Sequence, residues 1–216
     1  MKSEGTGTER TKQNLINAAG TLAAEQGLSN VSTRAVAKIS GENIGSIHYH
    51  FGSKDGLFKA MIDEAMVSGQ PDEASLLEQL NRSEDLSPQD LSKIIRSVIA
   101  ENIKSLFRSG QPDWHVQVIY QLIQREDDLF EIFNEKYLSP KLAFMDRLIR
   151  SIKPNLSDEE VFLHSCLIKL PIYAQASYMN ALLRQLKVPA YSDDYLEKFE
   201  DLLTRQTLLL LELPLD

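Results

Sequence analysis

The stretch Val31–Lys54, VSTRAVAKISGENIGSIHYHFGSK, decides the fold of this chain. Two short helical patterns, at about 33–39 and 43–50, are separated by a turn at Gly41, and Ser53 then opens a longer helix. This layout is typical of a helix-turn-helix, in which the second helix lies in the major groove of DNA. The stretch therefore predicts a DNA-reading element.

Local signals on either side set the expected ends of these helices. A helix over about 9–26 should end at Gly27, which tolerates a positive φ. Ser32 or Thr33 should cap the 33–39 helix, and Phe51-Gly52 should end the 43–50 helix. The expected inward face of the 33–39 helix consists of Ala35, Val36 and Ile39. The helix that follows Ser53 carries an apolar stripe of Leu57, Phe58, Met61, Ile62, Ala65 and Met66.

The rest of the chain also has helical periodicity, so we predict an all-α fold. Ser87-Pro88 starts a helix that runs to about Arg108. Further helices are expected at about 113–125, 128–150, 157–187 and 193–212, with a kink or split at Pro140 and a bend at Pro171. The predicted domains are a disordered tail (1–8), a helix-turn-helix domain (9–68) and a helical ligand-binding and dimerisation domain (69–216), divided near Gly69-Gln70-Pro71-Asp72.

Composition points to an ordinary globular protein, with 43% hydrophobic and 25% charged residues among 216. No apolar run approaches the ~18 residues that span a bilayer, and the polar N-terminus lacks the apolar core of a secretory signal. A single cysteine, Cys166, excludes an intrachain disulfide and fits a reducing compartment. We therefore expect a cytoplasmic protein without a membrane partner.

The net charge of −8 is unevenly distributed along the chain. Residues 1–65 hold seven of the 23 Lys and Arg residues and seven of the 31 Asp and Glu residues, so the whole acidic excess follows residue 65. A neutral N-terminal part on an acidic body is compatible with DNA binding through one face. The acidity elsewhere should discourage non-specific binding.

Residue types in the quoted stretch suggest individual contacts with DNA. The 43–50 helix must enter a groove about 12 Å wide, and the small residues Gly45 and Ser46 would let its backbone come close to base edges. Asn43, Ser46 and His48 are expected at bases, and Ile44 at a thymine methyl group. Phosphate contacts are expected from the hydroxyl and backbone N–H groups at Thr33, from Lys54, and from Tyr49 and His50; Arg34 could serve a phosphate or a base.

Residues 9–66 resemble the TetR family of bacterial transcriptional regulators. The resemblance rests on Gly27, on Ser32-Thr33-Arg34, on Ala37 and Gly41 in the turn, and on Ile47–Phe51 followed by Ser53–Leu57. The segment GENIGSIHYHFGSKDGLF is similar to a subgroup with a CecR-like C-terminal domain.

This resemblance implies roles for the same positions. By resemblance, Thr33, Ser46, Tyr49, His50 and Lys54 contact the DNA backbone, and Arg34, Asn43, Gly45 and His48 read or approach bases. The chain departs from the family at His48, where tyrosine is most common. DNA binding would become sensitive to pH near neutrality if His48 contacts DNA; the alternative is that His48 only packs or is solvated.

The 157–187 and 193–212 segments carry more apolar residues than one buried face needs, so a second face should meet a partner. In the TetR family the last two long helices form a four-helix dimer interface, and the apolar excess supports the same arrangement here. The predicted interface residues are Ala176, Met179, Leu183, Leu202 and Leu209. Candidates for a small-molecule effector pocket are Trp114, His115, Lys169, Tyr173 and Tyr178, although the last three could instead belong to the dimer interface and Trp114 could simply anchor its helix.

We expect a homodimeric repressor that binds a palindromic operator in double-stranded DNA and is released by a small molecule. The alternative is that the C-terminal domain docks a protein partner instead. Catalysis is not expected, since no nucleophile–base set or separated carboxylate pair is present. No metal or cofactor is expected either, because His48 and His50 point about 200° apart on a helix and cannot easily share one ion.

Overall fold

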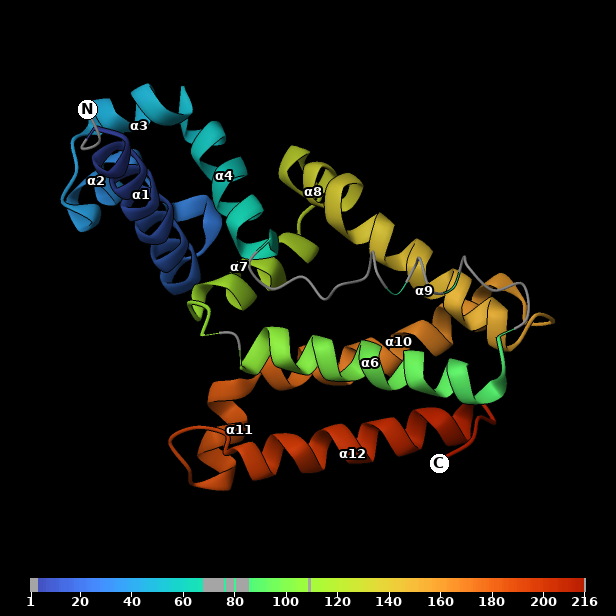
Figure 1. Ribbon diagram of the computed structural model, residues 1–216. Helices are drawn as coiled ribbons and strands as arrows, with labels where there is room; N and C mark the ends of the chain where they lie inside the picture. Colours follow the sequence, from blue (N-terminus) through green and yellow to red (C-terminus); the bar gives the residue numbers. More distant parts are fainter. Residues whose placement is uncertain (1–3, 68–75, 77–79, 81–85, 109, 216) are drawn as a thin grey trace. The chain divides into compact units, whose positions relative to one another are not determined.

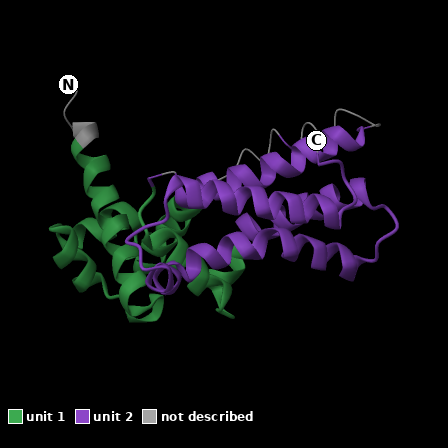
Figure 2. Ribbon diagram, turned by 90° about the horizontal axis from the view of Figure 1, so that it is seen from below, with its two compact units in different colours: residues 1–68, 111–134 green, residues 69–110, 135–216 purple. Residues whose placement is uncertain are grey.

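The computed structural model describes residues 4–67, 76, 80, 86–108 and 110–215, and within these ranges every regular element is helical (Figure 1). The all-α prediction is confirmed. The chain forms two compact units, residues 1–68 with 111–134 and residues 69–110 with 135–216 (Figure 2). The predicted boundary at 69–72 lies outside the described residues.

The first unit begins with the helices of the predicted helix-turn-helix domain. They are α1 (Glu4–Gln26), the 3-10 turn η1 (Leu28–Asn30), α2 (Thr33–Ser40), α3 (Ile44–Phe51) and α4 (Lys54–Val67). α1 extends back to Glu4, into the segment predicted as a disordered tail. The remaining ends lie within one residue of the positions predicted from local signals.

Capping groups and two left-handed glycines set these helix ends. The Ala35 N–H donates to the Ser32 hydroxyl at 3.1 Å, and the Gly56 N–H donates to the Ser53 hydroxyl at 3.0 Å. Gly41 ends α2 with φ 72°, and Gly52 ends α3 with φ 74°. These conformations are unfavourable for residues with a Cβ atom.

The core of the first unit confirms the apolar stripe of α4, whose six predicted members are all buried. On α2 the inward face consists of Val36 and Ala37, whereas Ile39 is exposed. The prediction for Ile39 was therefore wrong. α2 packs on α1, and at 100° per residue Ile39 lies about 110° from the midpoint between Val36 and Ala37, outside that contact.

Two helices from later in the chain complete the first unit. α7 (Trp114–Ile123) packs against α1 and α4, and α8 (Asp128–Phe133) follows it. The Gln121 side chain holds the end of α1, because its Nε2 donates to the Ala23 carbonyl and its Oε1 accepts from the Leu28 N–H, both at 2.8 Å. Residues 111–134 thus group with the N-terminal helices, and not with the remainder of the predicted 69–216 domain.

The second unit is a helical bundle formed by α6 (Pro88–Phe107), α9 (Ser139–Ile152), α10 (Asp158–Ser177), α11 (Met179–Leu186) and α12 (Asp193–Leu210). α6, α10 and α12 run side by side (Figure 1). The core between these helices is apolar; its fully buried members include Ile95, Ile99, Ile103, Met145, Leu148, Ile149 and Leu208.

Two long predicted helices are divided in the structure. The 128–150 segment passes from α8 through a π-helical turn, η2 (Asn134–Leu138), into α9, with Pro140 in the first turn of α9. The 157–187 segment divides at Tyr178, between α10 and α11, while Pro171 remains inside α10. The expected split at Pro140 is therefore present, and the main break in the second segment lies seven residues beyond Pro171.

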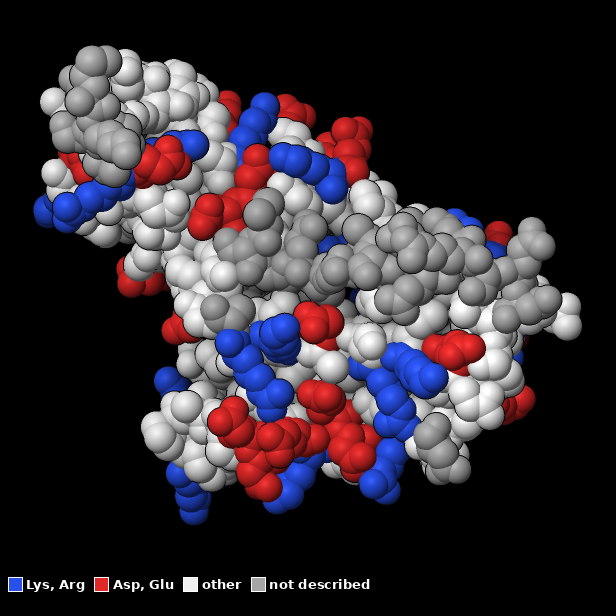
Figure 3. Space-filling view, viewed as in Figure 1, with Lys and Arg blue, Asp and Glu red and all other residues white. Residues whose placement is uncertain are grey.

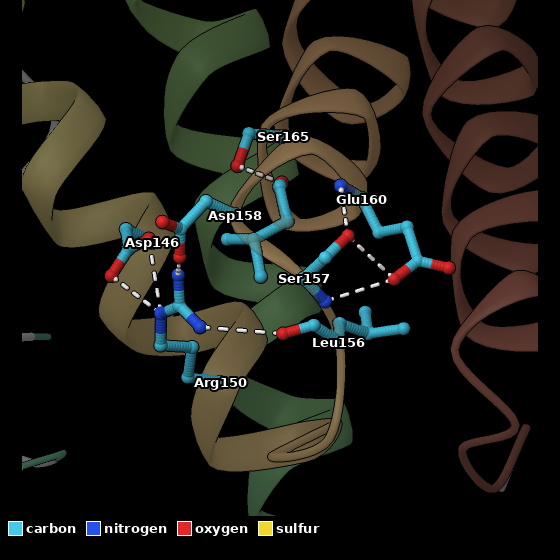
Figure 4. Close-up of polar contacts among 8 residues, drawn as sticks. Asp146, Arg150, Leu156, Ser157, Asp158, Glu160 and Ser165 are labelled. Atoms are coloured by element: carbon cyan, nitrogen blue, oxygen red, sulfur yellow. Dashed lines mark hydrogen bonds and ion pairs between the residues drawn. The ribbon is translucent and has the colours of Figure 1, made fainter.

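A cluster of polar contacts fixes the connection between α9 and α10 (Figure 4). The Arg150 guanidinium donates to Asp146 at 3.1 Å, to Asp158 at 2.5 Å and to the Leu156 carbonyl at 3.4 Å. Ser157 and Glu160 form a capping box, and the backbone N–H of Ser157 lowers the pKa of the Glu160 carboxyl. The α10 start is thus held by one cation and one reciprocal cap.

Candidate nucleic-acid interface

α3 presents one continuous face to solvent. Ile47 points inward and is fully buried, whereas Ile44 is 39% and Tyr49 82% exposed. Gly45 and His48 are exposed as well. At 100° per residue these four positions share one side of the helix, opposite Ile47. Large apolar groups and a glycine on the open side of a two-turn helix are unusual for a merely solvated face, and they suit close approach to a partner.

Asn43 caps the beginning of α3. Its Oδ1 accepts from the Gly45 N–H at 2.8 Å, so its amide NH₂ group is the part that can donate outward. A Cβ atom at Gly45 would lie 3.3 Å from that oxygen, a contact tighter than usual. Glycine at this position therefore keeps both the cap and the open approach to the helix.

His48 is tied to the end of α3 by two hydrogen bonds. The Gly52 N–H donates to the His48 carbonyl at 3.0 Å, and His48 Nδ1 lies 3.2 Å from the Gly52 carbonyl oxygen. Tyr49 and His50 pack edge to face, with ring centroids 4.9 Å apart. The imidazole of His48 and the phenol of Tyr49 thus stand exposed on the face described above, whereas His50 is half-buried.

The other predicted DNA contacts lie at helix starts. Thr33 is the first residue of α2, and the exposed Arg34 follows it. Lys54 is the first residue of α4, with its ammonium 5.1 Å from the centre of the Phe58 ring. Ser46 is half-buried on α3. Helix N-termini bear partial positive charge and unpaired N–H groups, which favour phosphate binding.

Sequence reasoning missed a residue that positions the turn. The Glu42 carboxylate accepts from the Thr11 hydroxyl at 3.2 Å and from the Asn14 amide at 3.0 Å. These bonds attach the turn between α2 and α3 to α1. The sequence held one signal for this role. Glu42 is an acidic residue directly before the Asn43 cap, in a region that is otherwise suited to binding phosphate.

The residues predicted to form an effector pocket fall in different units. Trp114 and His115 lie in the first unit and are 5% and 4% exposed, whereas Lys169, Tyr173 and Tyr178 lie in the second. Within the described residues, Trp114 Nε1 and His115 Nε2 have no hydrogen-bond partner. Burial lowers the pKa of His115, against a smaller opposing effect of Glu64.

The predicted dimer residues divide by their exposure. Leu202 and Leu209 on α12 are 66% and 64% exposed, whereas Ala176 and Leu183 are buried inside the chain and Met179 is half-buried. Exposed leucines are also present on α10, where Leu163, Leu167 and Leu170 are about half exposed. We name these five exposed leucines of α10 and α12 the leucine strip.

A groove of about 400 Å³ runs between α6 and α12 in the second unit. Three of its seven lining residues are acidic and one is basic, and acidic and basic side chains lie side by side on this face of the unit (Figure 3). The lining residues are Arg96, Ser97, Ala100, Glu197, Glu200, Asp201 and Thr204. No helix within the described ranges is long and apolar enough to cross a membrane.

The two short helices joined at Gly41, with α3 open to solvent and α1 behind them, have the arrangement of a helix-turn-helix DNA-binding protein. Residues 15–61 match the family model described as "Bacterial regulatory proteins, tetR family". The helix-turn-helix region of this chain is therefore of the type found in the TetR family of bacterial regulatory proteins.

Individual relatives agree with this placement. The chain is 27% identical over 169 residues to the HTH-type transcriptional dual regulator CecR of Shigella flexneri, covering 73% of this chain and 71% of CecR. Its fold is shared with the fatty acid degradation regulator FadR of Bacillus halodurans, with a TM-score of 0.60 and 19% identity over 91% of this chain and 97% of FadR. FadR of Bacillus subtilis in complex with stearoyl-CoA has a TM-score of 0.59 and 20% identity, over 92% and 96% of the two chains.

Proposed function

We propose that this regulator is a homodimeric repressor that binds a palindromic operator by placing α3 of each subunit in a major groove. The observation that carries the proposal is the open face of α3, formed by Ile44, Gly45, His48 and Tyr49 opposite the buried Ile47. Two-fold symmetry of the dimer would set two such helices at half-sites one helical turn or more apart.

The contacts divide into those that select bases and those that hold phosphates. His48 and the Asn43 amide face base edges, Ile44 meets a thymine methyl group, and Gly45 allows the close approach. Thr33, Tyr49, His50 and Lys54 hold phosphates, Ser46 lies at the edge of the same face, and Arg34 reaches either partner. Because Lys54 brings its charge to the start of α4, it contributes binding energy that does not depend on sequence.

DNA binding is tested on the region upstream of the chain's own gene, by fluorescence anisotropy at fixed salt. Lys54→Ala should weaken binding to all sequences and lower the salt slope by about one phosphate contact. Lys59→Ala is the matched control, since it removes the same charge from an exposed position further along α4. His48→Ala and Asn43→Ala should reduce discrimination between operator and random DNA, and parental discrimination in both variants would contradict their assignment to bases.

Dimerisation is assigned to the leucine strip. Five exposed leucines on two adjacent helices leave an apolar surface that association would bury. Leu209→Glu should shift the protein to the monomer in sedimentation velocity, because two carboxylates would be buried across the two-fold axis. The control is Ile123→Glu, at a comparably exposed apolar position on α7, which should leave the dimer intact. An unchanged dimer in Leu209→Glu would refute this interface.

A small molecule bound to the second unit would act by favouring a state whose α3 helices no longer match the operator spacing. The effector needs a differential affinity of about 1–3 kcal/mol between the two states. Stearoyl-CoA is the first probe, since FadR of the same fold holds it. Release of the operator by stearoyl-CoA and not by coenzyme A would assign an acyl-chain effector. Equal release by both, or by neither, would exclude that class.

A further inference from the structure

His48 and Gly52 form a reciprocal pair at the end of α3. The backbone of Gly52 donates to the carbonyl of His48, and the carbonyl of Gly52 faces the ring nitrogen Nδ1 of His48 at 3.2 Å. The φ of 74° at Gly52, which a residue with a Cβ atom adopts only with strain, turns the chain back at this point. The pair therefore fixes where the imidazole lies as well as where the helix ends.

The hydrogen bond to Gly52 also decides which nitrogen of the ring carries the proton. A carbonyl oxygen can only accept a hydrogen bond, so Nδ1 must be the donor. In the neutral imidazole one nitrogen is a donor and the other an acceptor. Nε2 of His48 is consequently an acceptor, and it has no partner among the described residues. His48 is exposed on the open face of α3, where this lone pair is available to DNA.

The four bases differ in what they offer such an acceptor in the major groove. Adenine presents its N6 amino group and cytosine its N4 amino group, both donors, whereas guanine and thymine present acceptor oxygens. An acceptor on the protein pairs with the first two and meets an unfavourable lone-pair contact with the others. A tyrosine hydroxyl, which family members commonly have at this position, is both donor and acceptor and does not discriminate in this way.

We infer that His48 is a specificity-determining residue that selects, at one position of each half-site, a base with an exocyclic amino group, adenine or cytosine. The inference rests on the proposed function, because it assumes that α3 enters the major groove. It assigns the selection to Nε2, and it makes the Gly52 carbonyl the positioning group that fixes the tautomer.

The tautomer is tested without DNA, by ¹⁵N chemical shifts of the imidazole in the full-length protein at pH 8. His48 should show the Nδ1–H form, and His48→Phe identifies its signals. The Nε2–H form would overturn the inference, whatever the protein does with DNA.

The base preference is tested by selecting binding sites for the full-length protein from random duplexes at pH 8, where an ordinary histidine is neutral. Adenine or cytosine should dominate one position of each half-site. Replacing that base by its analogue without the amino group, purine for adenine or 2-pyrimidinone for cytosine, should weaken binding about tenfold. The same replacement should have no effect on His48→Phe.

Two further variants separate this role from a general contribution to binding. His50→Phe should weaken all duplexes alike and leave the preference at the selected position. His48→Gln, whose amide both donates and accepts, should bind with a relaxed preference. If the parent binds no duplex selectively, the proposed function fails together with the inference; if it selects sites and His48→Phe keeps the same preference, only the inference fails.

Discussion

Gly20 on α1 lies against the Trp114 side chain of α7, and Gly20→Ala tests whether that contact holds the first unit together. The indole of Trp114 lies on the glycine, and a Cβ atom added there would be 2.2 Å from Cδ2, 2.4 Å from Cε3 and 2.5 Å from Cε2. Ordinary contacts of this kind are about 3.4–4 Å, so the ring or the helix must move by about an ångström. Because Trp114 is buried, it has little room to do so.

The expected change combines two opposing effects. Alanine in a helix interior is more favourable than glycine by about 1 kcal/mol. Overpacking of a filled core costs about 1–3 kcal/mol, and a rigid ring met by three close contacts belongs at the upper end of that range. Gly20→Ala should therefore lower the free energy of unfolding by about 2 kcal/mol.

The assay is urea unfolding followed by the fluorescence of Trp114, the single tryptophan of the chain, and by circular dichroism. Gly7→Ala is the matched control, because Gly7 lies on the same helix and a Cβ atom there would meet nothing within 4 Å. This control should be as stable as the parent or slightly more stable. Agreement of the two signals would show that the units unfold together; otherwise the comparison is restricted to the fluorescence transition.

A double-mutant cycle separates the clash from other effects of the methyl group. Trp114→Ala alone should be destabilising by about 3–5 kcal/mol, as for a large buried aromatic residue. In that background Gly20→Ala should become neutral or stabilising, since the ring is gone and only the helix preference remains. A parental or raised stability of Gly20→Ala in the presence of Trp114 would refute the packing argument.

Two other predictions concern the same unit. Burial lowers the pKa of His115 below its ordinary value of 6.5, so the unfolded chain binds a proton at this imidazole more readily than the folded chain does. The neutral His115 therefore contributes its full stability above the unfolded pKa. This contribution is lost as the pH falls from the unfolded pKa towards the folded pKa. The difference in the free energy of unfolding between the parent and His115→Phe should therefore be constant above about pH 7.5 and should decline below it. Urea unfolding at a series of pH values measures this difference. A difference that stays the same at every pH would contradict the prediction. Ser32→Ala should lower stability by about 1 kcal/mol, because it removes the cap of the Ala35 N–H; Ser32→Asp, which can make the same cap, should retain it, and equal loss in both variants would show that the cap is not the cause.

Local chemistry in the sequence predicted most helix ends correctly. Ser32, Ser53 and Ser87 are predicted as helix starts from their own neighbours, and each has the expected capping contact. Such signals involve residues at most four positions apart, so their geometry is nearly independent of the rest of the fold. The apolar stripe of α4 was predictable for the same reason, since the helical period alone places its members on one face.

The division into units could not be read from periodicity. Gly20 and Trp114 are far apart in the chain but pack against each other. The residues next to either of them give no sign of this contact. The same limit applies to α10 and α12. The sequence shows that these helices carry an excess of apolar residues, but it does not show which of them pack inside the chain. The structure buries Ala176 and Leu183 inside the chain and leaves Leu202 and Leu209 exposed.

By itself, the sequence determined that the chain is all-α and that a helix-turn-helix lies between Val31 and Lys54, because capping, turns and helical period are local properties. Tertiary structure alone decided that α7 completes the first unit and that Glu42 ties the turn to α1. These features depend on where helices and loops meet in three dimensions. A pattern of residue types records only which side of a helix is apolar.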